Sequence, residues 1–373
     1  MRKFIWLALM AAGLTLATCA TIRAADPATS TPLSELSNVS FRGFNLTAVT
    51  KDGFGSNYPI DTALQFIADE GANLVALDWM VEFKDDGTKA SGGGRRHALF
   101  EDIQSVIAKA KDRGLYVVLK PHITDEVGDN RNDPDVATFL PSNFFPAWKA
   151  YMAQLGAFAT ENNVDAICIG TEMYGLDWRF RDSWVDLIAA VRQSFAGELT
   201  YDSMMQQWEA SKDIKDVVFW DKLDFMSCSL YVSLTKDDNA SVASLRAQFT
   251  NGSIGDRRNI ITYLKGVSEK FGKQIMGLEG GYPSVTGGFV TPGSIKPSLS
   301  RLTNYDLQKR GIEAYLSMLY ENQGTWLKGI CLYGLTPMQM TRHEMEGINF
   351  SQSLSVYDKP AADVVKEYYT LGQ

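Results

Sequence analysis

Two hydrophobic patterns alternate along this chain. Short apolar runs of strand length are each followed by a longer segment whose apolar residues recur every three or four positions. Eight such strand and helix pairs follow a Ser/Thr/Pro-rich leader, which predicts a parallel sheet that closes into a (β/α)8 TIM barrel. The predicted strands cover residues 39–45, 73–79, 115–121, 166–173, 198–204, 223–231, 274–281 and 329–335, and the predicted helices cover 60–70, 98–113, 145–161, 183–195, 210–220, 259–271, 305–322 and 361–369.

The longest connections in this pattern all follow predicted strands. In a TIM barrel, the loops that leave the carboxyl ends of the strands lie on the face that carries the active site. We therefore expect a single domain, residues 26–373, whose long loops build one cleft. These loops cover residues 81–97, 122–143, 233–258 and 280–302.

Two of the apolar runs end in a glutamate. The run from Ala166 ends at Glu172, and the run from Gln274 ends at Glu279 and is followed by two glycines. A single glutamate at such a position is commonly a structural carboxylate, but two at the tips of strands four and seven can converge in a barrel. Glycoside hydrolysis needs one carboxylic acid and one carboxylate at the scissile bond, so we predict that both glutamates are catalytic.

Other side chains near predicted strand ends are candidates for substrate binding. His122 follows strand three, where it could bond a sugar hydroxyl or tune a carboxylate, although a lone histidine is often a core residue. Tyr231 ends strand six, where its phenol could hold the nucleophile or simply pack. Aromatic residues at or just after strand ends could stack on sugar rings, although any one of them could belong to the core: Trp79, Tyr174, Trp178, Trp208 and Tyr282.

Several other chemistries lack their motifs. The chain has no H-E-x-x-H and no G-x-S-x-G, its three histidines are isolated, and residues 92–94 form a Gly-rich loop without the features of a phosphate cradle. The acidic residues between 125 and 135 lack the regular spacing of an EF-hand, so a solvated acidic face is preferred over a calcium site. We therefore expect no metal and no cofactor.

The first 25 residues have the layout of a secretory signal peptide. Basic residues at positions 2 and 3 precede an apolar segment, Phe4 to Ala17, and small residues follow. Cys19 could mark a lipoprotein cleavage site, but Thr18 before it fits that pattern poorly. We expect export to the periplasm or the medium, and no later apolar run is long enough to predict a membrane span.

The net charge limits the kinds of molecule that the chain could bind, and the cysteine content limits the disulfides that it could form. Removing residues 1–25 leaves 33 Lys and Arg against 44 Asp and Glu, a net charge of −11, which argues against nucleic acid or an anionic membrane as a partner. The remaining cysteines, Cys168, Cys228 and Cys331, lie in apolar runs and are expected to be buried thiols; their number permits one disulfide. A neutral poly- or oligosaccharide suits this surface, and we expect a monomer.

With these residues in view, the chain resembles the retaining glycoside hydrolases of clan A, and most nearly family 113, which is known for endo-β-mannanases. The similarity is spread over most of the predicted domain. The segments that carry it include Leu119-Lys120-Pro121-His122, Gly170-Thr171-Glu172, Leu199-Thr200-Tyr201, Phe219-Trp220-Asp221-Lys222-Leu223-Asp224, Glu279 with Gly281-Tyr282, and Asp358-Lys359-Pro360-Ala361.

The resemblance implies a role for each matched residue. It makes Glu172 the general acid/base and Glu279 the nucleophile, with His122 and Tyr231 around the scissile bond. Thr171 stands where much of the clan has asparagine, and strand eight lacks the clan's tryptophan, differences that bear on the sugar preference. We expect a retaining hydrolase of β-linked glycans, endo-β-1,4-mannanase-like. The alternatives are a hydrolase of another β-glycan and a barrel that binds carbohydrate without cleaving it.

Overall fold

The computed structural model describes most of the predicted catalytic domain. The predicted signal peptide, Cys19 and Trp208 lie outside the described residues, as do residues 126–135 of the acidic loop. The described residues are 31–48, 54–84, 87–88, 100–125, 140–205, 212–254, 258–293, 298, 300–340, 344–345 and 348–372.

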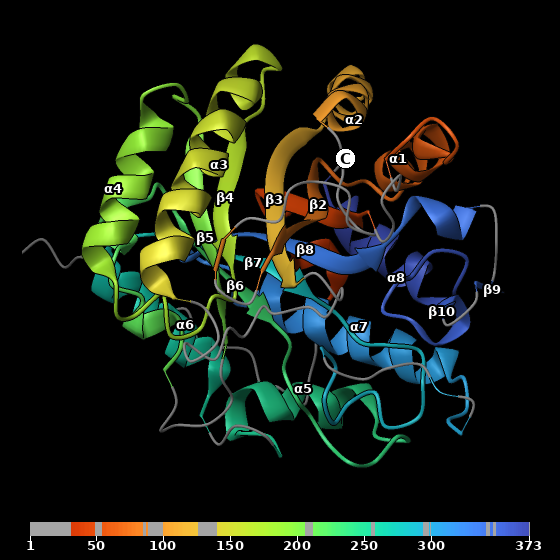
Figure 1. Ribbon diagram of the computed structural model, residues 1–373. Coiled ribbons are helices and arrows are strands. Elements are labelled where there is room, and N and C mark those ends of the chain that lie inside the picture. The colour runs from red at the N-terminus through yellow and green to blue at the C-terminus, as the bar shows by residue number, and fades with distance from the viewer. Residues whose placement is uncertain are drawn as a thin grey trace, which may run out of the picture.

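Eight parallel strands form a closed barrel in sequence order (Figure 1). β1 pairs with both β2 and β8, so the sheet has no free edge. This confirms the predicted TIM barrel. The strands are β1 (Phe41–Thr47), β2 (Leu74–Phe83), β3 (Tyr116–Asp125), β4 (Ala166–Thr171), β5 (Glu198–Met204), β6 (Met226–Leu230), β7 (Ile275–Gly280) and β8 (Leu327–Leu335).

The strands are apolar because both of their faces are covered. Every residue of β2, β4, β6 and β7 is buried, which is why these strands appear in the sequence as continuous apolar runs. Side chains alternate between the helix layer and the barrel interior. The interior cluster consists of Leu74, Ala76, Val118, Ala166, Cys168, Phe225, Met276, Leu278 and Cys331.

Helices cover the outside of the barrel (Figure 1). Each buries one face at helical spacing, as α1 does with Ile60, Ala63, Leu64 and Ile67. Within the described residues, no helix combines the length and the apolar composition needed to cross a membrane. The helices are α1 (Ile60–Asp69), α2 (Phe100–Asp112), α3 (Pro141–Glu161), α4 (Arg181–Arg192), α5 (Val242–Asn251), α6 (Ile260–Phe271), α7 (Tyr305–Glu321) and α8 (Ala361–Tyr369).

Two elements differ from the sequence prediction. The helix expected at 210–220 is replaced, in the described part of that segment, by two single 3-10 turns, Ile214–Asp216 and Trp220–Lys222. Asp213 is the N-cap of the first turn and forms a capping box with Asp216. Conversely, the segment 233–258, expected to be irregular, contains α5, which begins after the N-cap Ser241 and packs on α6 and α7.

The cysteines behave as small apolar side chains. Cys168, Cys228 and Cys331 are all buried and all free. Cys168 donates a weak hydrogen bond to the carbonyl of Gly170, 3.1 Å away. The one disulfide that their number permits is therefore not formed.

One buried lysine joins the last helix to the loop after β7. Lys359 is 8% exposed. Its ammonium donates to Ser284 Oγ (2.9 Å), to the Ser353 carbonyl (3.0 Å) and to Ser353 Oγ (3.2 Å). None of these partners carries a charge, and burial lowers the pKa of Lys359 from 10.5 to about 7.

Because of Lys359, we expect the free energy of unfolding to rise with pH. Between pH 7 and 10.5 the unfolded chain holds a proton on Lys359 that the folded chain has released, so the free energy of unfolding should increase by up to about 1.4 kcal/mol per pH unit. Urea unfolding at pH 7, 8 and 9 should show a smaller rise for Lys359→Met than for the parent protein. The exposed Lys236 gives a control, Lys236→Met, which should keep the parent slope. Equal slopes for both variants would contradict this account.

Candidate active site

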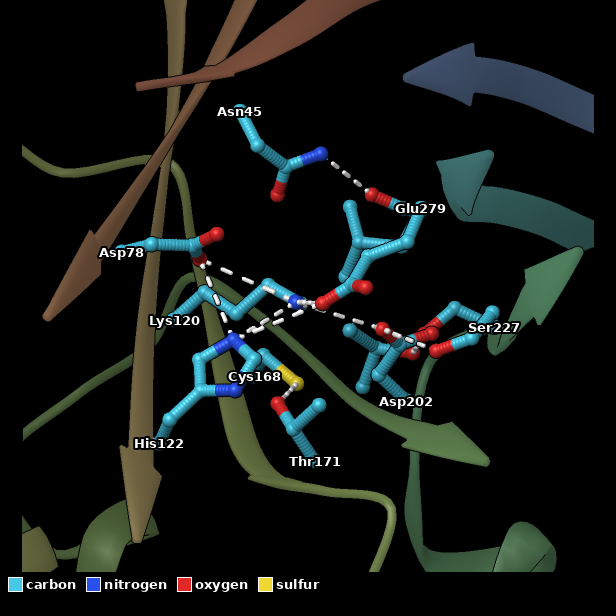
Figure 2. Close-up of polar contacts among 12 residues, drawn as sticks. Asn45, Asp78, Lys120, His122, Cys168, Thr171, Asp202, Ser227 and Glu279 are labelled. Carbon is cyan, nitrogen blue, oxygen red and sulfur yellow. Dashed lines mark hydrogen bonds and ion pairs between the residues drawn. The ribbon is translucent and has the colours of Figure 1, made fainter. Parts of the chain in front are cut away.

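A buried lysine stands at the centre of the candidate site (Figure 2). Lys120 on β3 has no exposed surface. Its Nζ donates to Glu279 Oε1 and to His122 Nε2, the latter at 2.9 Å. It also ion-pairs with Asp202 Oδ2 at 3.4 Å and with Asp78 Oδ1 at 3.7 Å. Four strands, β2, β3, β5 and β7, therefore meet at one ammonium group.

Strand register explains how Asp78 and Lys120 come together. Asp78 pairs with Lys120 across β2 and β3, and Thr47 pairs with Asp78 across β1 and β2. Both polar residues stand two positions beyond interior residues, Ala76 and Val118, on the same inner face. Burial alone would lower the pKa of Lys120, but Asp78, Glu279 and Asp202 together raise it well above its ordinary value. Lys120 therefore stays charged.

Glu279 is directed into this cluster by an irregularity of β7. Cys228 pairs with Gly277 and Ser229 pairs with Glu279, so Leu278 is an extra residue between the two pairs. Such a bulge changes which side of a strand the next side chain faces. Besides Lys120, the carboxylate accepts a hydrogen bond from Tyr231 Oη at 3.1 Å on Oε2. Glu279 thus has a cation on one oxygen and a phenol on the other.

Glu172 reaches the cluster from the turn after β4. Its backbone N–H donates to the carbonyl of Asp202 at 2.7 Å, and its φ is +50°. The residue is half-buried overall, while its carboxyl group lies among protein atoms. Burial and the nearby Glu279 charge raise the pKa of Glu172, contact with the Ser229 hydroxyl lowers it, and the net result is a pKa of about 7. A carboxyl group with such a raised pKa suits the role of an acid/base.

Asp202 is a further buried carboxyl group of the cluster, and the sequence did not predict it as a site residue. Burial raises its pKa and the Lys120 charge lowers it, with a net value of about 7. Ser229 Oγ donates to Asp202 Oδ2 at 3.4 Å. A signal was present, because Asp78 interrupts the apolar run of β2 and Asp202 follows Leu199-Thr200-Tyr201 on β5. Lys120 was quoted only as part of a motif.

His122 faces the charged cluster. It is 1% exposed, and its Nε2 lies 3.5 Å from both Asp78 Oδ1 and Glu279 Oε1. Because Lys120 donates to Nε2, the ring proton of a neutral His122 belongs on Nδ1. Of the two roles predicted for His122, this position favours the tuning of a carboxylate over direct contact with sugar.

The oxygens and nitrogen of Asp78, His122 and Glu279 lie within 4.8 Å of one another, close enough to hold a metal ion. Lys120 already contacts all three residues. A metal ion bound there would have to compete with this ammonium group for the same ligand atoms.

The aromatic candidates divide into two groups, and the prediction fails for two of them. Trp79 has no exposed surface and donates from Nε1 to Tyr151 Oη at 2.9 Å, within the layer between barrel and helices. Tyr282 is 1% exposed and donates to the Val232 carbonyl at 2.9 Å. Neither ring presents a face on which a sugar could stack, so both are packing residues.

Tyr174 and Trp178 remain half-buried on the segment that follows Glu172. The Arg179 guanidinium lies 4.2 Å from the centre of the Trp178 ring. Trp208 lies outside the described residues. Tyr333 on β8, not predicted as a site residue, is half-exposed, with its ring centre 6.0 Å from Lys120 Nζ and 6.5 Å from that of Tyr231.

A groove of about 750 Å³ lies elsewhere, between α3 and α4 on the outer helix layer. It is lined by residues such as Pro146, and the ion pair of Lys149 with Asp186 spans it at 2.6 Å. It includes none of the predicted site residues. The buried charge cluster inside the barrel is therefore the better candidate site.

Comparisons with known proteins identify the family and support the fold. The family model described as Glycoside Hydrolase Family 113 matches residues 50–359. A family 113 β-1,4-mannanase, solved as a complex, aligns with a TM-score of 0.69 at 21% identity over 89% of this chain and 99% of that one. The β-mannanase AaManA from Alicyclobacillus acidocaldarius, solved with ManMIm, aligns with a TM-score of 0.70 at 22% identity over 91% and 99%.

A more distant structure also shares the barrel. The endoglucanase Cel5A from Pseudomonas stutzeri aligns with a TM-score of 0.54 at 12% identity over 90% of this chain and 97% of that one. A search of curated proteins found no match. At these identities the structural matches show the fold, whereas the family model covers more than half of the chain.

The charge cluster predicts that Lys120 stabilises the protein strongly at neutral pH. Lys120→Met leaves Asp78, Asp202 and Glu279 buried without their cation, which should lower the free energy of unfolding by about 3–5 kcal/mol. The loss should shrink as pH falls below about 7, because Asp202, whose pKa is raised to about 7 mainly by burial, becomes protonated and no longer needs the cation. Urea unfolding at pH 7 and at pH 4 measures both.

A matched control is Lys149→Met, which removes a partly exposed ion pair with Asp186. Its cost should stay within about 1 kcal/mol at either pH. If the two variants lost similar stability at pH 7, the cluster would not have the role assigned to it.

Proposed function

The chain belongs to glycoside hydrolase family 113, and from that premise we propose that it cleaves β-1,4-linked mannan or manno-oligosaccharides within the chain, with retention of anomeric configuration. The sugar is proposed from the names of the family 113 relatives, which are β-1,4-mannanases. The reaction is proposed from the chain's own two glutamates.

The contrast between the two glutamates carries the proposal. Glu279 accepts a hydrogen bond from Lys120 on one oxygen and from the Tyr231 hydroxyl on the other, so both oxygens act as acceptors, as those of a nucleophilic carboxylate would. Glu172 is buried beside that negative charge, so its pKa is raised to about 7 and the group is largely protonated below that pH. A double displacement needs this pairing of an ionised nucleophile with a protonated acid.

The proposed reaction has two steps. In the first, a Glu279 carboxylate oxygen bonds to the anomeric carbon, the glycosidic C–O bond breaks, and Glu172 gives its proton to the departing oxygen. In the second, Glu172 takes a proton from water, the water oxygen bonds to the anomeric carbon, and the ester bond to Glu279 breaks. Both glutamates return to their starting forms, and the two inversions give net retention.

Endo action is proposed because ring-binding surface extends beyond the two glutamates. Tyr174 and Trp178 follow Glu172 on one segment and are half-buried, so they could contact sugar units on one side of the cleaved bond. Tyr333, on β8, lies beside Lys120 and Tyr231. A polymer substrate also fits the proposed removal of residues 1–25 on export, since intact mannan lies outside the cell.

The role of each glutamate can be tested by azide rescue. Glu279→Ala should abolish turnover of mannohexaose, because no group remains to form the covalent intermediate. Glu172→Ala should keep cleaving 2,4-dinitrophenyl β-mannobioside, whose leaving group needs no proton, and azide should accelerate it and yield the β-mannobiosyl azide. The products can be assigned by NMR.

Formation of an α-mannobiosyl azide by Glu172→Ala would show that the two roles are reversed. An azide effect in neither variant, with both still folded by circular dichroism, would reject the double displacement. Binding of mannohexaose by the parent protein without any hydrolysis would favour the non-catalytic barrel.

The substrate can be tested separately from the mechanism. The purified domain 26–373 should release a series of short oligosaccharides from glucomannan, galactomannan and mannohexaose, and much less product from xylan or cellulose. Product sizing by chromatography decides between the cases. Monosaccharide as the sole early product would reject endo action, and turnover confined to cellulose or xylan would reject the mannan preference while leaving the two-glutamate mechanism standing.

A further inference from the structure

The turn that carries Glu172 has an unusual backbone conformation. Glu172 has a φ of +50°, a region that side chains with a Cβ rarely adopt. Elsewhere in the described residues, the non-glycine positions with positive φ are Asn163 and Asp358, and these residue types tolerate that region better than glutamate does. Such a conformation persists only when surrounding contacts hold it in place.

Tyr201 supplies one of these contacts from the layer between the barrel and the helices. It lies on β5 and has no exposed surface. Its hydroxyl oxygen accepts the backbone N–H of Met173, the residue after Glu172, at 2.8 Å. The same hydroxyl donates to Asp177 Oδ2 at 3.2 Å. One phenol thus links the start of the turn to a carboxyl group four residues further on.

Asp177 fixes the other side of the turn. It is 5% exposed, and its Oδ1 accepts the N–H of Gly175 at 3.1 Å. Its own N–H donates to the Met173 carbonyl at 3.2 Å, and its carbonyl accepts the N–H of Val218 at 3.1 Å. The segment from Met173 to Asp177 is therefore closed on itself and tied to the chain that follows β5.

Tight packing holds the Tyr201 ring in place. Its centre lies 5.5 Å from that of Trp184 and 5.2 Å from that of Phe219, both edge to face. Met173 is fully buried and covers Gly170, where an added Cβ would come within 3.0 Å of the Met173 sulfur and 3.1 Å of Trp184. The hydroxyl of Tyr201 is thus a fixed point rather than a movable group.

We propose that Tyr201 is a positioning residue that, together with Asp177, holds the Glu172 turn so that the carboxyl group reaches the leaving-group oxygen. Tyr201 acts from the side of β4 away from the barrel interior, through the Met173 N–H, and need not touch substrate. The inference rests on the proposed role of Glu172 as general acid. It goes beyond that role by assigning the geometry of the acid to a residue outside the charge cluster.

The test uses leaving groups that differ in their need for an acid. In Tyr201→Phe the ring stays but the Met173 N–H and the Asp177 carboxyl lose their shared partner. The value of kcat/KM for phenyl β-mannobioside should fall by about 100-fold, because a misplaced acid protonates poorly. The value for 2,4-dinitrophenyl β-mannobioside should stay within about twofold, because that leaving group departs unprotonated.

Two further variants keep the test decisive. Tyr369→Phe removes another fully buried phenol hydroxyl, whose donor bond goes to the Gly43 carbonyl on β1, and should change neither value. If Tyr201→Phe does not fold, Asp177→Asn weakens the acceptor of the Tyr201 hydroxyl while keeping its size, and should give the same selective loss to a smaller degree.

An equal fall for both substrates, or no fall for either, would overturn the positioning role. The variant Glu172→Ala separates this failure from failure of the proposed function. If Glu172→Ala shows the selective loss and Tyr201→Phe does not, only the inference about Tyr201 is wrong. If the activity of Glu172→Ala does not depend on the leaving group, Glu172 is not the general acid. The inference about Tyr201 is then wrong as well.

Discussion

One buried ammonium group constrains the whole catalytic end of this barrel. A lysine without exposed surface is costly unless charges compensate it, and Lys120 has three carboxylates around it. Those carboxylates in turn would be costly without the lysine. The strands that carry them must therefore keep their relative register, since a slip by one residue would turn a charged side chain toward the helix layer. Electrostatic pairing thus specifies the geometry into which Glu279 is placed.

The barrel interior is divided into two layers by this arrangement. Small and medium apolar residues, such as Ala76, Val118 and Met276, fill the part below the cluster. The polar layer above contains the groups assigned to chemistry. Apolar packing below stabilises the closed sheet, and this stability compensates for gathering several carboxyl groups in a confined space. The raised pKa of Glu172 is the chemical result of that confinement.

The sequence was sufficient for the barrel because the alternation of strand and helix patterns recurs along the predicted domain, although 3-10 turns replace the helix predicted at 210–220 in its described part. It also predicted Glu172 and Glu279 as a pair of site residues, since each ends an apolar run. It failed for Trp79 because β2 continues to Phe83, four residues beyond the predicted end, so Trp79 lies inside the strand instead of at its tip. No single run could reveal Lys120 as a partner of Asp202, because that contact crosses the barrel between β3 and β5. The helix α5 was missed because few of its residues are buried.

Gly280, the residue after Glu279, connects the candidate active site to the helix layer. A side chain at Gly280 would collide with the hydroxyl of Tyr315, a fully buried residue of α7. The backbone that carries Glu279 therefore rests directly on that helix. Anyone who transplants this catalytic face onto another barrel would need to bring α7 along with the loops. Conversely, loops after the strands could be exchanged to seek new sugar preferences, provided that the contact between Gly280 on β7 and Tyr315 on α7 is kept.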